Sequence, residues 1–196
     1  MPIPSPPRLA ALAAGVLLAG LAPVITSARF SDFPPTKCAG AVKDIIPLLD
    51  ARKLDTFGAK DTVAGRFVAV MYVPGQRMFG VSAGYTRPGD IEYFIDHQDY
   101  KSVYESLRSS AYATDRIIID DAEANGLVPQ PKRSQPDDDA VFGNERKTFD
   151  GIFSEPKKTD PKKPSFDDYL KSFTQADEAY THILTVVTDA LKKGAS

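Results

Sequence analysis

The chain contains two histidines, and the first offers the most direct route to catalysis. In the run His97-Gln98-Asp99, an imidazole that could act as a general base stands beside a carboxylate. Residues one or two apart on a helix face different directions, so His97 and Asp99 can pair only if the helix breaks here. The His97 region would carry the reaction if the protein were a small hydrolase. His182 lies largely off the apolar stripe of its segment, which predicts a surface residue.

Acidic residues form a second group that could carry out a chemical function. Asp120, Asp121 and Glu123 follow a predicted strand, and positions 137–139 add further carboxylates in a later loop. Oxygen ligands of this kind suit calcium, which makes this group the alternative metal site. The spacing and the glycine of an EF-hand are absent, and acidic loops are mostly just solvated. We therefore predict no metal and no cofactor.

Composition and motifs argue against several classes of function. Cys38 is the one cysteine, so an internal disulfide cannot form, and a half-buried structural thiol is expected. The sequence has no Gly-x-Ser-x-Gly elbow, phosphate-binding loop or dinucleotide fingerprint, so no catalytic residue is predicted and an enzyme is disfavoured. With 24 basic against 26 acidic residues, the chain lacks the positive excess that nucleic-acid binding requires.

The glycine-rich side of one predicted strand is the best candidate for a binding surface. Along 78–85, large side chains alternate with small ones at Gly80, Ser82 and Gly84, which leave one face nearly bare. A helix of the same chain packed closely on this face is the favoured interpretation, and a ligand or partner is the alternative. The predicted binding residues are Gly80, Ser82, Gly84, Tyr85, His97 and Tyr100.

The first 28 residues have the pattern of a secretory signal peptide. A short segment ending at Arg8 precedes the uncharged run 9–25, and Ala28 supplies a small residue for cleavage. We expect export to the periplasm or the extracellular space, with a lead-in over 29–43. The alternative is an uncleaved anchor, which would give the protein its one contact with a membrane.

The remaining pattern predicts a single α+β domain over 44–193. Strands are expected at 67–73 and 78–85, joined by a Pro-Gly turn, with another at 117–119, a short start at 127–128 and a hairpin about 143–144. Helices are expected at 44–53, with Asp44 as cap and Pro47 in the first turn, at 88–108 with a break at 96–99, and at 165–193. Positions 54–65, a Pro-rich stretch at 129–139 and a Lys-rich linker at 155–164 are expected to be loops.

This order, α-β-β-α-β-β-(β)-α, predicts an antiparallel sheet of about four to five strands flanked by helices, because the strand pairs have hairpin-length links. The layout is similar to that of profilin-like and roadblock-like domains. Strand, turn, strand and helix also occur in succession in flavin-binding split barrels. That alternative needs a basic phosphate-binding set near 78–85, for which Arg77 and Arg87 are the candidates.

Several short motifs resemble a family of small exported bacterial proteins of unknown function. They are YVPGQ, VSAGY, Tyr100-x-x-Val103-Tyr104-x-x-Leu107, Asp121-x-x-x-x-Gly126-Leu127, FDG at 149–151 and Ala176-Asp177-x-x-Tyr180. The resemblance covers about 44–191 and implies export and a single α+β domain, but no activity. The predicted function is a non-enzymatic exported domain that binds a protein or a small molecule. The flavin-binding protein and the hydrolase are the alternatives.

Overall fold

The computed structural model describes residues 36–86, 89–128, 138–148 and 166–194. Its helices are α1 (Cys38–Arg52), α2 (Asp90–Asp96), α3 (Tyr100–Arg108) and α4 (Phe166–Lys193), with a short 3-10 turn at Pro74–Gln76. Its strands are β1 (Thr56–Asp61), β2 (Arg66–Val73), β3 (Met78–Tyr85), β4 (Thr114–Asp121), β5 (Asp139–Phe142) and β6 (Glu145–Thr148). No helix in these ranges is both long and apolar enough to cross a membrane.

The six strands form one antiparallel sheet in the order β1-β2-β3-β4-β5-β6, so each strand lies beside the next one along the chain. This confirms the predicted single α+β domain. The prediction of a loop over 54–65 is wrong, because β1 pairs with β2 from Thr56↔Met71 to Asp61↔Arg66. The sequence of β1, TFGAKD, shows no apolar alternation, because a glycine and an aspartate are among its buried residues, and this is why the strand was not predicted.

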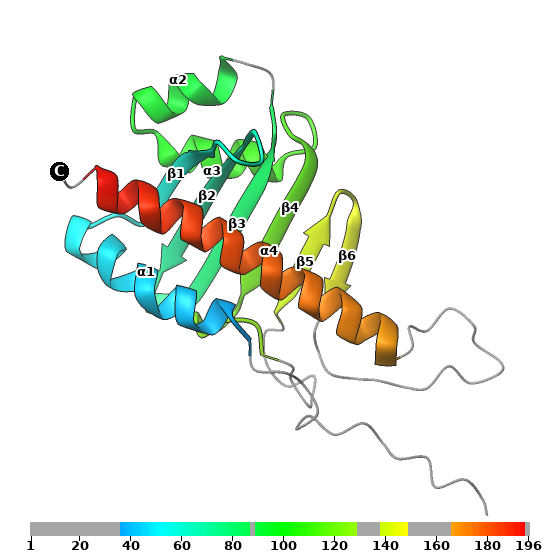
Figure 1. Cartoon of the computed structure of the whole chain (residues 1–196). Helices are drawn as coiled ribbons and strands as arrows, with labels where there is room; N and C mark the ends of the chain where they lie inside the picture. The colour runs from blue at the N-terminus through cyan, green and yellow to red at the C-terminus, as the bar shows by residue number, and fades with distance from the viewer. Residues whose placement is uncertain (1–35, 87–88, 129–137, 149–165, 195–196) are drawn as a thin grey trace, which may run out of the picture.

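Helices cover both faces of the sheet (Figure 1). On one face, α1 and α4 enclose the larger core, in which Ile45, Phe79, Phe173, Tyr180 and Leu184 are fully buried or nearly so. On the other face, α3 packs against β1, β2 and β3. The smaller core there includes Phe67, Ala69, Val103 and Leu107, and α2 adds Ile91.

Helix α1 begins earlier than predicted, at Cys38, and Asp44 does not cap it. Its first N–H groups, those of Lys37 and Cys38, instead donate to the carboxylate of Asp177 on α4, over 3.0 and 2.8 Å. Pro47 lies in the helix interior rather than in the first turn. A proline there removes one helical hydrogen bond, and the exposed position of Pro47 leaves the freed carbonyl of Lys43 within reach of water.

The predicted break in the 88–108 segment is confirmed. Gln98 takes a left-handed conformation with φ +57°, and the Asp99 carboxylate then caps α3 by accepting from the Ser102 N–H over 3.2 Å. The hairpin about 143–144 is also confirmed, as β5 and β6, with Gly143 at φ +61°. Leu127 and Val128 do not form a strand; they lie in the loop that follows β4.

Candidate functional site

The bare face of β3 is covered by α3 and the segment after it, which confirms the favoured interpretation of close helix packing. Ser82 is fully buried, and its hydroxyl donates to the backbone carbonyl of Tyr104 over 3.2 Å. A Cβ atom on Gly80 would overlap the Tyr104 hydroxyl, and one on Gly84 would lie 2.9 Å from the Cβ of Ala113. Gly80, Ser82 and Gly84 therefore serve packing inside the domain and offer no open surface to a ligand.

The tyrosine that presses on Gly80 belongs to a fixed polar group. Arg108 donates to the Tyr104 hydroxyl over 2.8 Å and, through two nitrogens, to both oxygens of Asp120 over 2.9 and 2.8 Å. Burial raises the pKa of Tyr104 to about 12, which keeps its hydroxyl neutral at any ordinary pH. The bidentate geometry holds α3 against β4, and it uses both oxygens of Asp120.

The alternative calcium site is not assembled. Asp120 pairs with Arg108, whereas Asp121 accepts the N–H groups of Glu123, Asn125 and Gly126 over 3.3, 3.2 and 2.7 Å. Glu123 accepts from the Asn125 side chain over 2.9 Å. The three carboxylates thus have separate partners. Within the described ranges, no group of three or more His, Cys, Asp or Glu residues is placed to hold a metal ion.

Three buried carboxylates instead hold the loop after β4 and the start of α1. Asp138 accepts from the Ala122 and Val128 N–H groups over 2.9 and 2.8 Å, and Tyr180 donates to Asp121 over 3.1 Å. With Asp177, which caps α1, these carboxylates form what we call the buried acid cluster. Burial, with a smaller contribution from the charges of Asp121 and Glu123, outweighs the two hydrogen bonds and raises the pKa of Asp138 to about 7.

Cys38 lies at the edge of this cluster and is fully buried rather than half-buried as predicted. Its sulfur accepts from the Leu127 N–H over 3.2 Å, and burial together with Asp177 raises the pKa of the thiol. Because the thiolate is the reactive form, this environment makes Cys38 chemically inert.

The other predicted binding residues, His97, Tyr100 and Tyr85, have no described contact with one another. His97 is exposed at the end of α2, where its Nδ1 lies 2.8 Å from the carbonyl of Tyr93, and none of its described contacts is with a carboxylate. Tyr100 is half-buried with its ring 4.7 Å from that of Phe57. Tyr85 ends β3 after a register shift and is 42% exposed. His97 therefore lacks the orienting group that a hydrolase needs.

His182, which was predicted to be a surface residue, is the histidine that does have such a group. Nε2 of His182 on α4 lies 2.7 Å from Oδ2 of Asp61, at the end of β1. The prediction of a plain surface residue for His182 was incomplete, since its side chain is 40% exposed while the Asp61 side chain is fully buried. No local signal could reveal this pair, because 121 residues separate the two positions.

Asp61 is well placed to orient the imidazole. Its other oxygen accepts from the N–H groups of Val63 and Ala64 over 3.2 and 3.0 Å, and Arg66 approaches Oδ2 to 3.4 Å. Burial alone would raise the pKa of Asp61, but the Ala64 hydrogen bond, His182 and Arg66 outweigh it and lower the pKa. A fixed carboxylate behind a partly exposed imidazole is the arrangement that favours general-base chemistry.

Exposed aromatic residues gather at one end of the molecule. Tyr85, Tyr93 and Tyr112 are 42%, 59% and 55% exposed. Tyr85 pairs with Thr114 at the start of β4, two residues after Tyr112, and Tyr93 lies on α2, which follows β3 in sequence. Figure 1 shows the end of β3, α2 and the start of β4 at the same end of the sheet. We call this region the tyrosine end.

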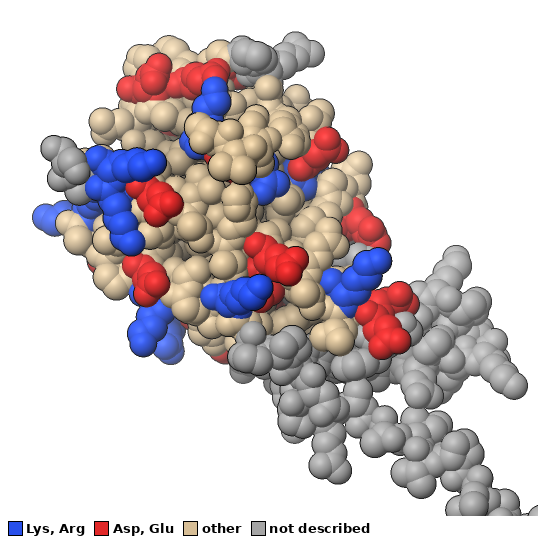
Figure 2. Space-filling model, in the orientation of Figure 1, with Lys and Arg blue, Asp and Glu red and all other residues tan. Residues whose placement is uncertain are grey.

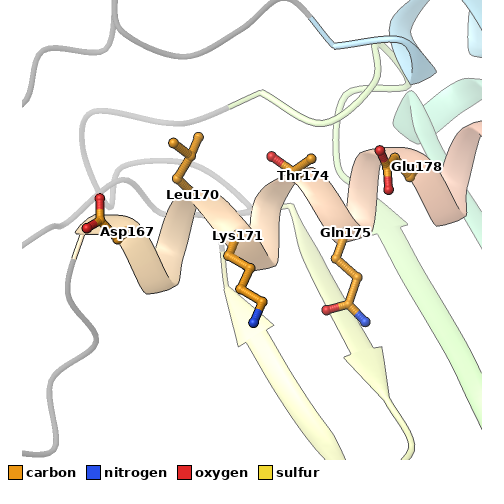
Figure 3. Close-up of a pocket in the computed structure, with 6 residues that line it drawn as sticks. All are labelled: Asp167, Leu170, Lys171, Thr174, Gln175 and Glu178. Carbon is orange, nitrogen blue, oxygen red and sulfur yellow. The ribbon is translucent and has the colours of Figure 1, made fainter.

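A shallow, open hollow of about 470 Å³ lies elsewhere, along α4 (Figure 3). Its described lining comes from one face of that helix alone: Asp167, Leu170, Lys171, Thr174, Gln175 and Glu178. None of these residues belongs to the His182 pair or to the buried acid cluster. A hollow of this kind has no convergent polar groups and carries no assignment.

Comparison with family models, with curated proteins and with solved structures finds no match to this chain. The resemblance to small exported bacterial proteins, drawn from short motifs, therefore remains a prediction.

Proposed function

We propose that this protein is an exported, non-enzymatic domain that binds another protein through its tyrosine end. The observation that carries the proposal is the gathering of Tyr85, Tyr93 and Tyr112 at one end of the sheet. Tyrosine is enriched at protein interfaces because a rigid ring buries much area while its hydroxyl keeps a polar partner. Single exposed apolar residues are ordinary, but three exposed tyrosines around one sheet end favour a contact surface.

The sheet itself supports this choice over the flavin alternative. Its six described strands form an open meander from β1 to β6 and do not close into a barrel. Arg77 lies exposed in the β2–β3 turn, and Arg87 lies outside the described residues. The bare side of β3, where a phosphate group would approach, is filled by Tyr104 and Ala113.

Export is the part of the proposal that the N-terminal sequence supports. If the signal segment is cleaved after Ala28, the exported protein begins at Arg29. Mass spectrometry of the protein recovered outside the cytoplasm should therefore find Arg29 at its N-terminus. An intact Met1 end in the membrane fraction would replace cleavage by anchoring, and protein found wholly in the cytoplasm would end the export proposal.

Site-specific photo-crosslinking in the native cell tests the interaction. A photoreactive amino acid at Tyr93 or Tyr112 should yield one discrete crosslinked species, whereas the same group at the exposed positions Asp44 and Thr185 should not. Tyr93 and Tyr112 are exposed, so the substitutions leave the core intact. Equal labelling at all four positions, or none at the tyrosine end, would contradict the proposed function.

A hydrolase is the second candidate, and the pair of His182 with Asp61 is the observation that favours it. In such a hydrolase, His182 rather than His97 activates water, and Asp61 orients the His182 ring. Purified protein should then cleave activated esters such as p-nitrophenyl acetate, with activity lost in His182→Gln and retained in His97→Gln. Equal rates in the two variants would remove this candidate.

A further inference from the structure

The outer side of α2 presents a mixed acidic and aromatic surface. At about 100° per residue, Asp90, Tyr93, Asp96 and His97 fall on one side of the helix, away from Ile91. All four are exposed, whereas Ile91 is fully buried and joins the core under α3. We call these four residues the outer α2 face. It lies within the tyrosine end (Figure 1).

The rings of Tyr93 and His97 are in close, tilted contact. Their ring centroids are 4.1 Å apart with an interplanar angle of 31°, and His97 Nδ1 lies 2.8 Å from the Tyr93 carbonyl. Fixing an aromatic ring before binding reduces the rotamer entropy that association would otherwise cost. Tyr93 is still 59% exposed, so a face of its ring remains open to a partner.

The charges beside this pair are negative. Among the described residues, Glu92 pairs with Lys60 over 3.4 Å, but Asp90 and Asp96 form no ion pair. Figure 2 shows acidic side chains along the part of the surface where α2 lies. The C-terminal ends of α1 and α4 carry basic residues instead: Arg52 and Lys53 at α1, Lys192 and Lys193 at α4.

We propose that the outer α2 face binds an arginine- or lysine-bearing segment of a partner protein. A cation placed over the Tyr93 ring gains a cation–π contact, and Asp90 and Asp96 supply charge complementarity on either side. This assignment of partner chemistry rests on the proposed function and makes it more specific. It predicts discrimination against neutral and acidic segments, because these would leave the two carboxylates without counter-charges.

Fluorescence anisotropy with the mature chain, 29–196, tests the inference. The probe is a labelled peptide of alternating glycine and arginine, and its matched control has glutamine in place of each arginine. The arginine peptide should bind and the glutamine peptide should not. Tyr93→Leu, which keeps apolar area but removes the ring, should weaken binding by about three-fold, the size of an exposed cation–π contact, while Tyr93→Phe should retain it.

Charge variants locate the contact. Asp90→Asn combined with Asp96→Asn should weaken binding by on the order of ten-fold, whereas Asp44→Asn, an exposed acid on α1, should change it by less than about two-fold. Equal loss in Asp44→Asn, or binding of the glutamine peptide, would overturn the inference. Thermal melting of each variant checks that the fold is intact.

The outcomes also separate this inference from the proposed function. Crosslinking through Tyr112 without binding of the arginine peptide would keep an interaction domain but reject a cationic partner. Peptide binding at the outer α2 face without a crosslinked species in cells would show a cation-binding surface while rejecting the proposed function.

Discussion

The hydroxyl of Tyr104 on α3 occupies the space that a side chain at Gly80 on β3 would need. Arg108 donates to that hydroxyl and is itself fixed by Asp120, so the ring cannot easily rotate away. Glycine is costly within a strand because it loses more backbone entropy than other residues and packs no side chain. Here the close approach of α3 to the sheet depends on it.

Gly80→Val should therefore destabilise the fold by roughly 1–3 kcal/mol through overpacking. The matched control is Gly40→Ala on α1, where a new Cβ meets nothing within 4 Å and should stabilise the helix by up to about 1 kcal/mol. Urea unfolding measures both. An unchanged midpoint in Gly80→Val would mean that α3 does not press on this face in solution.

Phe173 anchors the N-terminal half of α4 to the larger core and is 1% exposed. Phe173→Ala should lower the free energy of unfolding by roughly 3–5 kcal/mol, because it removes buried apolar area and leaves a cavity. Thr174→Ala, on the exposed side of the same turn, should change it by less than about 0.5 kcal/mol. A loss below about 1 kcal/mol at Phe173 would show that this part of α4 is not core.

The buried acid cluster should make stability depend on pH in an unusual direction. Asp138 has a pKa of about 7 in the folded protein, against about 3.9 in an unfolded chain, so the folded state holds the proton more tightly. The stabilisation is fully present below about pH 4 and is lost as pH rises through about 7, by at most about 4 kcal/mol. The pKa of Asp121 is raised too, which acts in the same direction.

Asp138→Asn isolates this contribution. The amide can accept only one of the Ala122 and Val128 hydrogen bonds, so the variant should be less stable than the original by about 1–3 kcal/mol near pH 5. The gap should close or reverse near pH 8, where the ionised Asp138 is costly. Asp61, whose pKa is lowered, is present in both proteins, so its contribution to the pH dependence cancels from the gap. A constant gap from pH 4 to 8 would refute the raised pKa.

A double-mutant cycle measures the contact between His182 and Asp61. Asp61→Ala should cost about 2–4 kcal/mol, since two backbone N–H groups and Arg66 also lose their partner. His182→Ala should cost about 1–2 kcal/mol, less because this ring is partly exposed. The coupling should exceed about 0.5 kcal/mol, and purely additive effects would place the two side chains apart in solution.

The sequence predicted those elements in which apolar residues recur with a clear period or are bounded by a distinct turn. The strands around the Pro-Gly turn, the broken helix at 96–99 and the long apolar stripe of α4 all have a clear local period. The missed features either lack a clear apolar period or depend on a distant partner. Strand β1 is short and holds Asp61 on its buried side, and the first turn of α1 is capped by Asp177, which lies about 140 residues further along.

In the candidate site, too, local patterns could be predicted and contacts between distant residues could not. Close packing on Gly80, Ser82 and Gly84 could be predicted, since small residues on alternate positions require something to approach closely. His97, the predicted candidate for a general base, has no carboxylate among its described contacts, whereas His182 has Asp61. A side chain's neighbour across the fold, rather than its neighbour in sequence, decides which imidazole is oriented.

The cap on α1 has a consequence for the order in which the domain can assemble. Asp177 binds the N-terminus of α1, and Arg52 near its C-terminus donates to the carbonyl of Leu191, both across 139 residues. Helix α1 therefore runs parallel to the second half of α4, and both ends of α1 are bonded to it. Because α4 follows every strand of the sheet, a growing chain that stops before residue 166 leaves α1 uncapped and one face of the sheet exposed. Such a chain would have the strands of its sheet but not the cover that excludes water, and folding should be completed only once α4 has been made.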